Sequence, residues 1–197
     1  MESYTRRLPV YLLLDCSASM TGEPIEAVRQ GVKALVNELK SDPQALEAAH
    51  LSVITFDSRA RQVIPLTELS QFKMPSLTPG GATSLGGALQ MLRKCVEEEM
   101  LPGGPGRKGD WQPLVFILTD GVPTDADLFL EEARRIPALR LGALVACAAG
   151  ADADTGYLHK LTDQVLMLNT LSAGDLARFF SWVSGAVAAH FPGHPGR

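Results

Sequence analysis

The sequence predicts a single α/β domain with a doubly wound, mostly parallel central sheet of about six strands, one of them an antiparallel edge strand, and helices on both faces. Short continuous apolar runs alternate along the chain with segments whose apolar residues recur at helical spacing. The 197 residues are enough to bury roughly 70% of the surface of the unfolded chain. A content of 46% hydrophobic and 20% charged residues excludes the disordered classes.

The first half of the chain is predicted to contain three strands and two helices. The strands are expected at 10–14, 51–56 and 61–66, the last returning antiparallel after a turn. The helices are expected over 25–39 and 85–96, where apolar residues follow one helical face. Proline follows the first helix at position 43, and a loop rich in Pro, Gly, Ser and Thr precedes the second helix.

The second half continues the alternation after a Gly/Pro-rich surface connection. Apolar runs predict strands at 114–118, 141–147 and 165–168. Helices are expected at 127–136 and, after a capping pair at Ser172, over the last apolar face of the chain. The sequence divides into an N-terminal extension (1–7), the domain (8–190) and a flexible C-terminal tail (191–197).

Charge and cysteine content narrow the function classes. The 18 basic and 22 acidic residues give a net charge of −4, and no Lys/Arg run exceeds a pair, so no nucleic-acid partner is expected. The three cysteines are widely spaced in apolar or helical patterns and predict buried thiols, as in a reducing compartment. No apolar stretch reaches the length of a membrane span, and no signal peptide is recognised, so a cytoplasmic location without membrane contact is expected.

Oxygen-bearing side chains follow two of the predicted strands and the Gly-rich loop. Asp15, Ser17 and Ser19 come directly after the first strand. Thr83 follows the loop, and Asp120 follows the fourth strand. If these strands are neighbours at the point where strand order reverses, the side chains converge beyond their carboxyl ends. Such hard ligands favour Mg²⁺, with Mn²⁺ or Ca²⁺ as alternatives, over zinc or copper.

This pattern, Asp-x-Ser-x-Ser with a distant Thr and a strand-terminal Asp-Gly, resembles the von Willebrand factor A domain and its metal-ion-dependent adhesion site (MIDAS). The resemblance extends over about residues 8–190 and implies a Rossmann-like fold. Within the family, the stretches RRLPVYLLLDCSASMTGEPIEAV, LSVITFDSRA and LTPGGATSLGGAL look like the intracellular tellurite-resistance-associated subgroup. Cys16, and Ala18 where the pattern often has glycine, depart from it without removing a ligand.

The resemblance implies a role for each matching residue. Ser17, Ser19 and Thr83 would ligate the ion through their hydroxyls, and Asp15 and Asp120 would hold its waters or bind it directly. The protein would then be a non-enzymatic module that docks a Glu or Asp of a partner protein on the metal. For the subgroup, the implied setting is a tellurite, metal or stress-resistance system with kinase- or phosphatase-like partners. Alanine at either aspartate is expected to abolish partner binding and leave the fold intact.

Other functions and other roles for these residues stay open at this point. A metal-dependent phosphohydrolase on a similar sheet needs Asp-x-Asp after the first strand, and here Ser17 stands at the second position. A scaffold domain with a vestigial metal site is a further alternative. Asp57 is expected to be a hairpin residue, and Asp125 to cap a helix. The glycine pairs flanking Thr83 lack the Lys of a phosphate loop and are interpreted as loop geometry.

Overall fold

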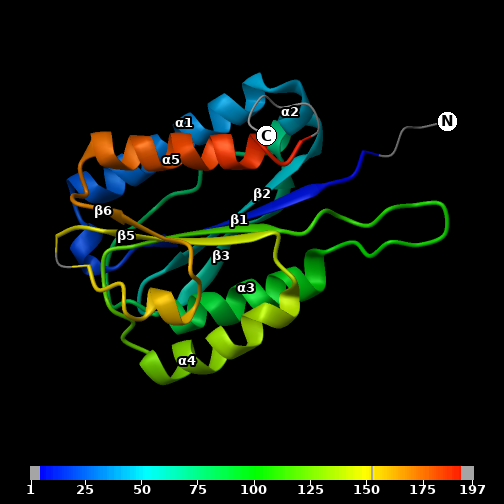
Figure 1. The fold of residues 1–197 in the computed structure, drawn as a ribbon. Coiled ribbons are helices and arrows are strands. Elements are labelled where there is room, and N and C mark those ends of the chain that lie inside the picture. Colours follow the sequence, from blue (N-terminus) through cyan, green and yellow to red (C-terminus); the bar gives the residue numbers. More distant parts are fainter. Residues whose placement is uncertain (1–4, 152, 192–197) are drawn as a thin grey trace.

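The computed structural model describes residues 5–151 and 153–191. Their six strands form one sheet in the order β3-β2-β1-β4-β5-β6 (Figure 1), with only β3 antiparallel to its neighbour. The strands are β1 Leu8–Asp15, β2 Ala49–Phe56, β3 Ala60–Glu68, β4 Leu114–Thr119, β5 Ala143–Ala149 and β6 Val165–Leu168. The predicted mixed, doubly wound sheet is confirmed.

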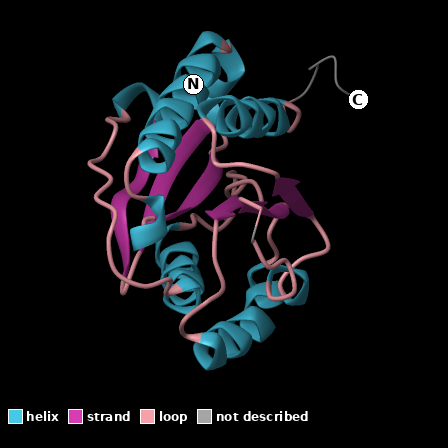
Figure 2. Cartoon of the chain, turned by 90° about the vertical axis from the view of Figure 1, so that its left-hand side faces the viewer, coloured by secondary structure: helices cyan, strands magenta, loops and turns pink. Residues whose placement is uncertain are grey.

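Within the described residues, five α-helices cover the two faces of the sheet. Those above it in Figure 1 are α1 Glu23–Ser41, α2 Pro43–Ala48 and α5 Ala173–Ala188, and those below it are α3 Leu85–Glu99 and α4 Ala126–Arg135. Figure 2 shows the sheet between these two helical layers. Short 3₁₀ turns complete the connections at Ala18–Met20, Leu69–Gln71, Ile136–Leu139 and Leu158–Lys160.

Strand β1 forms the centre of the core because all eight of its residues are buried. Val10, Leu12 and Leu14 belong to the apolar cluster shared with α1 and α5. Tyr11 and Leu13 alternate with them and belong to the cluster shared with α3 and α4. A strand covered on both faces therefore reads as an uninterrupted apolar run, which is the pattern that predicted it.

The layer formed by α1 and α5 depends on one close approach. A Cβ atom at Gly31 of α1 would collide with the ring of Phe180 of α5. Glycine at this position lets the two helices pack directly against each other over the sheet. The apolar face that the sequence assigned to 25–39 is thus buried against both α5 and the sheet.

Two element boundaries differ from those that the sequence predicts. Pro43 does not only follow α1; it begins the six-residue helix α2, whose N-cap is Asp42. The Oδ1 atom of Asp42 accepts hydrogen bonds from the backbone N–H groups of Gln44 and Ala45. The strand expected at 141–147 begins two residues later, at Ala143.

The ends of the domain and the thiols are also defined. Phe191, which was assigned to the flexible tail, is buried against the core beside α5, and residues 192–197 of that tail lie outside the described residues. Cys16, Cys95 and Cys147 are free and buried, as expected. Among the residues that the structure describes, no helix is long and apolar enough to cross a membrane.

Candidate metal centre

The predicted site residues lie at the carboxyl ends of β1 and β4, at the topological switch point of the sheet. The strand order runs from β1 through β2 to β3 on one side and from β4 through β5 to β6 on the other. Strands β1 and β4 pair in parallel, with Leu14 opposite Leu118, so Asp15 and Thr119 end the two strands side by side. Ligands in open α/β sheets bind at this location.

Asp15 is fully buried and is fixed by two hydrogen bonds. Its Oδ1 atom accepts from the backbone N–H of Ser17 at 2.8 Å, and its Oδ2 atom accepts from the hydroxyl of Thr119 at 2.7 Å. Thr119 was not among the predicted site residues. Its role depends on the register between β1 and β4, which the order of elements along the chain does not give.

The charge of Asp15 is poorly compensated within the protein. Burial raises the pKa of the Asp15 carboxyl, and the neighbouring Asp120 carboxylate raises it further, whereas the hydrogen bonds from Ser17 and Thr119 lower it. The raised pKa means that these two hydrogen bonds do not offset the loss of solvation. A cation beside Asp15 would favour its ionised form.

The serines after β1 form a turn that is tied to the loop before α3. The Ser17 and Ser19 hydroxyl oxygens are 3.0 Å apart, with Ser17 buried and Ser19 exposed. The backbone N–H of Ala18 donates to the carbonyl of Gly81 at 3.1 Å, and that of Gly80 donates to the carbonyl of Cys16 at 2.8 Å. These reciprocal bonds hold the loop that carries Thr83 against the end of β1.

Thr83 is buried and is joined to the segment that follows β4. The Thr124 N–H donates to the Thr83 carbonyl at 2.9 Å, and the Thr83 N–H donates to the Thr124 hydroxyl at 3.3 Å. The Thr83 hydroxyl oxygen lies 3.6 Å from the point where a Cβ atom of Gly121 would stand. The structure therefore brings Thr83 next to the Asp120-Gly121 pair, as the sequence predicted.

Asp120 provides the observation most specific to a ligand. Its Oδ1 atom is buried and has no hydrogen-bond partner among the described residues. Buried carboxylate oxygens are normally paired, because leaving one unpaired costs about 1–3 kcal/mol or more. An unpartnered carboxylate oxygen beside a second carboxylate, together with three hydroxyls, fits a hard divalent cation. Across the described part of the chain, no group of three or more His, Cys, Asp and Glu side chains could hold a metal instead.

Asp125 has the expected kind of role on an unexpected helix. It is the N-cap residue of α4, but its carboxylate accepts no capping bond there. It instead accepts from the Ser84 hydroxyl at 2.8 Å and from the N–H groups of Gly86 and Gly87 at 3.0 and 2.8 Å, at the start of α3. Asp125 thus holds Ser84, the residue after Thr83, although the two are 41 positions apart in the sequence. No local sequence pattern predicts this contact.

The remaining candidates have structural roles. Asp57 is a hairpin residue, as expected: its Oδ1 atom accepts from the Arg59 N–H at 2.9 Å, and its Oδ2 atom pairs with Arg61 at 3.1 Å. A Cβ atom at Gly86 would stand 2.5 Å from the backbone nitrogen of Phe129. Glycine there allows α3 to lie close to α4. The interpretation of the second glycine pair as loop geometry was therefore wrong, because Gly86 and Gly87 lie in the first turn of α3.

Comparison with known proteins agrees with this architecture. The family model of the von Willebrand factor type A domain matches residues 10–167. An uncharacterized protein of Synechocystis sp. is 32% identical over 127 residues, which are 61% of this chain and 27% of that protein. The chain spans about a quarter of the length of the curated relatives that it matches.

Two solved structures show the same fold at low identity. The vWF domain of the type V pili tip protein Mfa5 from Porphyromonas gingivalis has a TM-score of 0.70 at 12% identity and covers 99% of both chains. Proximal thread matrix protein 1 from the mussel byssus has a TM-score of 0.67 at 20% identity, over 93% of this chain and 48% of that chain. That structure has a zinc-occupied MIDAS motif.

Proposed function

Because the chain belongs to the von Willebrand factor type A domain family, we propose that it is a non-enzymatic protein-interaction module whose metal centre docks an acidic residue of a partner protein. The residues proposed to hold the cation are Asp15, Ser17, Ser19, Thr83 and Asp120. The observation that carries the proposal is the buried Oδ1 atom of Asp120, which is unpartnered among the described residues and lies at the switch point of the sheet.

The charges of these residues explain why an acidic ligand is favoured. A bound divalent cation supplies an open coordination position for a carboxylate oxygen. Asp15 and Asp120 together carry two negative charges, which balance such a cation, and the three hydroxyls add no charge. The site is then formally neutral, so an approaching Glu or Asp meets no excess negative charge although the whole chain has a net charge of −4.

Mg²⁺ is the proposed ion, with Mn²⁺ and Ca²⁺ as alternatives. Few carboxylates combined with neutral oxygen donors leave room for several waters, which is the coordination that Mg²⁺ prefers. Zn²⁺ belongs in the same comparison because it occupies the MIDAS motif of the mussel protein. The order of affinity is measured directly by titrating each ion into the metal-free protein.

We further propose that the protein acts in the cytoplasm in a tellurite, metal or stress-resistance system, with kinase- or phosphatase-like partners. The support for this setting is the resemblance of three stretches to the tellurite-resistance-associated subgroup: one around Asp15, one over β2 and the turn that follows it, and one around Thr83. The three buried, free thiols agree with a reducing compartment.

The proposal is tested by retrieving partners from a native lysate with Mg²⁺ or with EDTA. Asp120→Ala is expected to abolish Mg²⁺ binding in calorimetry and to abolish retrieval of any partner that EDTA releases. Asp15→Asn is the better second variant, because Asp15→Ala would leave the Ser17 N–H and the Thr119 hydroxyl without their acceptor. Asp127→Asn, at an exposed acid in the first turn of α4, is the matched control and should retain both properties.

Two results would contradict the proposal. Partner binding that survives both EDTA and Asp120→Ala would show that the metal centre is not the docking point. Binding of Mg²⁺ with no metal-dependent partner would favour a scaffold domain whose metal site has lost its ligand.

A further inference from the structure

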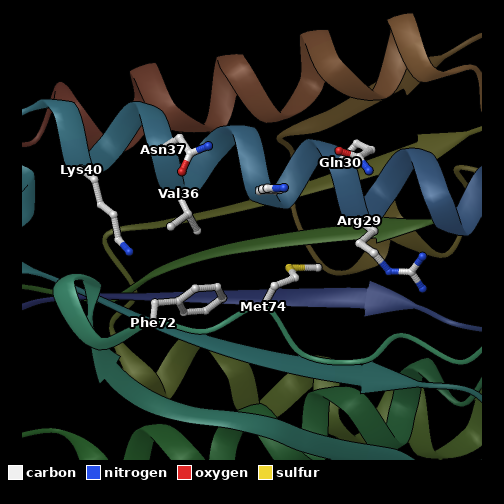
Figure 3. A pocket seen from close by; sticks show the side chains of 8 residues that line it. Arg29, Gln30, Val36, Asn37, Lys40, Phe72 and Met74 are labelled. Atoms are coloured by element: carbon white, nitrogen blue, oxygen red, sulfur yellow. The ribbon is translucent and has the colours of Figure 1, made fainter.

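A second recess lies on the outer side of α1, between that helix and the segment that follows β3. It has a volume of about 350 Å³, within the range of about 300–1,000 Å³ typical of ligand pockets. Its apolar surface comes from Val36 of α1 and from Phe72 and Met74 of the facing segment (Figure 3). Val36 and Phe72 are 6% and 7% exposed, so they form the floor of the groove.

The rim of this groove is basic, and no Asp or Glu is among the described residues that line it. Arg29, Lys33 and Lys40 line it from α1, with Arg29 and Lys40 near its two ends in Figure 3. Arg29 pairs with Glu26 and donates to the Leu77 carbonyl at 3.1 Å. Lys33 and Lys40 have no ion-pair partner within the described residues. The groove therefore has an excess of positive charge on a protein whose net charge is −4.

The dimensions of the groove match a short extended peptide. Arg29 and Lys40 are 11 residues apart on one helix, which corresponds to about 16 Å at 1.5 Å per residue. An extended chain covers this distance with about five residues at 3.3 Å each. Carboxylates along such a peptide can meet Lys33 and Lys40, while one apolar side chain enters between Val36 and Met74.

We propose that this groove is a second docking site, for an acidic peptide segment of a partner protein that carries one or two apolar residues among Asp and Glu. The charge complementarity favours an acidic segment, and the apolar floor favours a hydrophobic anchor within it. The groove is built from α1 and residues 72–74, none of which belongs to the proposed metal ligands. Binding here does not depend on the metal.

The same features argue against two other polyanions. A membrane surface is bound by apolar side chains that project into it, whereas Val36 and Phe72 are buried in the floor. Single-stranded nucleic acid stacks on exposed aromatic rings, and Phe72, the aromatic residue that lines this groove, is 7% exposed. An acidic peptide needs only the recessed floor and the charged rim.

The test uses fluorescence anisotropy with a labelled probe peptide, Glu-Asp-Glu-Leu-Phe-Glu-Asp-Glu, in EDTA. Lys33→Glu combined with Lys40→Glu is expected to weaken binding at least about tenfold. The matched control combines Lys94→Glu with Lys108→Glu, two exposed lysines outside the groove lining, and has the same net charge as the test variant. The control should bind within about twofold of the unmodified protein.

Control probes separate the two parts of the proposal. A peptide with Gln and Asn in place of the acids tests the charge, and one with Ser in place of Leu and Phe tests the apolar anchor; both should bind at least about tenfold more weakly. Equal loss in the two double variants, or tighter binding to phosphatidylserine vesicles or oligo-dT than to the peptide, would overturn the proposal. Peptide binding that needs Mg²⁺ and is lost in EDTA and in Asp120→Ala would place the peptide at the metal centre instead and overturn this proposal. Binding that persists in EDTA and in Asp120→Ala supports the groove, whether or not the metal-centre proposal holds.

Discussion

Acidic side chains are buried at both ends of the central strands, β1 and β4. At one end every carboxylate oxygen has a partner, and at the other end one carboxylate oxygen has none among the described residues. Where β1 and β4 begin, the side chain of Asp110 is fully buried and every oxygen of its carboxylate is partnered. Its Oδ1 atom accepts from Arg7 at 2.9 Å, and its Oδ2 atom accepts from Arg7 at 2.6 Å and from the Leu101 N–H at 2.8 Å. Nearby, Glu99 accepts from Tyr11 at 2.9 Å and from Gln62 at 2.9 Å.

Where the same two strands end, the hydrogen bonding is incomplete. Asp15 accepts from two neutral donors, and the Oδ1 atom of Asp120 has no partner among the described residues. A buried carboxylate is costly unless it is paired. The carboxylates at the first end, here called the closed edge, are therefore paired within the protein. The second end, the open edge, leaves a carboxylate oxygen for the proposed cation.

The largest expected effect comes from breaking the ion pair between Arg7 and Asp110 at the closed edge. Arg7→Met keeps much of the side-chain volume but leaves Asp110 buried without its cation. We expect the free energy of unfolding to fall by about 3 kcal/mol, at the low end of the range for breaking a buried ion pair because Arg7 is 20% exposed. Urea denaturation measures this. Arg61→Met removes an exposed ion pair with Asp57 and should cost less than about 0.5 kcal/mol. Equal losses in the two variants would mean that the buried pair of Arg7 and Asp110 contributes no more to stability than an exposed pair does.

The second prediction concerns the open edge, where removing a carboxylate should raise the free energy of unfolding of the metal-free protein. Asp120→Ala removes an unpartnered buried oxygen and relieves the repulsion on Asp15, so the metal-free variant should be about 1 kcal/mol more stable than the unmodified protein. At a Mg²⁺ concentration 100 times the Kd, the unmodified protein should gain about 2.7 kcal/mol and the variant nothing. Urea midpoints with EDTA and with Mg²⁺ measure both. A metal-free variant that is clearly less stable would mean that Asp120 contributes to the fold like Asp110.

The sequence predicted the open edge better than the closed one, for a physical reason. Asp15, Ser17 and Asp120 lie within a few residues of strand ends, so periodicity alone placed them together once a parallel sheet was assumed. The partners that complete each edge come from long-range geometry. Thr119 meets Asp15 only through the register of β1 and β4. Asp110 meets Arg7 across 103 positions.

The short helix α2 was predictable from a local sequence pattern. Asp42 before Pro43 combines an N-cap side chain with a proline in the first helical turn, which is the signature of a helix start. Interpreting Pro43 only as the end of α1 leaves α2 unpredicted. The basic groove had no such signal, because Phe72 and Met74 lie in an irregular segment and meet α1 only in the folded chain.

The last prediction concerns the hydrogen bonds that Glu99 accepts at the closed edge. Tyr11→Phe removes one donor to Glu99, which keeps its bonds from Gln62 and from the Leu66 N–H, so the free energy of unfolding at neutral pH should fall by only about 1 kcal/mol. Burial raises the pKa of the Tyr11 phenol well above its ordinary value, and the Glu99 carboxylate raises it further.

The pH dependence of this variant gives a second measurement with a defined sign. Above about pH 10 the unfolded phenol ionises while buried Tyr11 stays neutral, so the unmodified protein loses stability as the pH rises through that range. The variant lacks this contribution, and its deficit relative to the unmodified protein should shrink between pH 9 and pH 11. Urea denaturation across this interval measures the deficit. A constant deficit would mean that Tyr11 ionises as readily in the folded chain as in the unfolded one, and that the closed edge admits water.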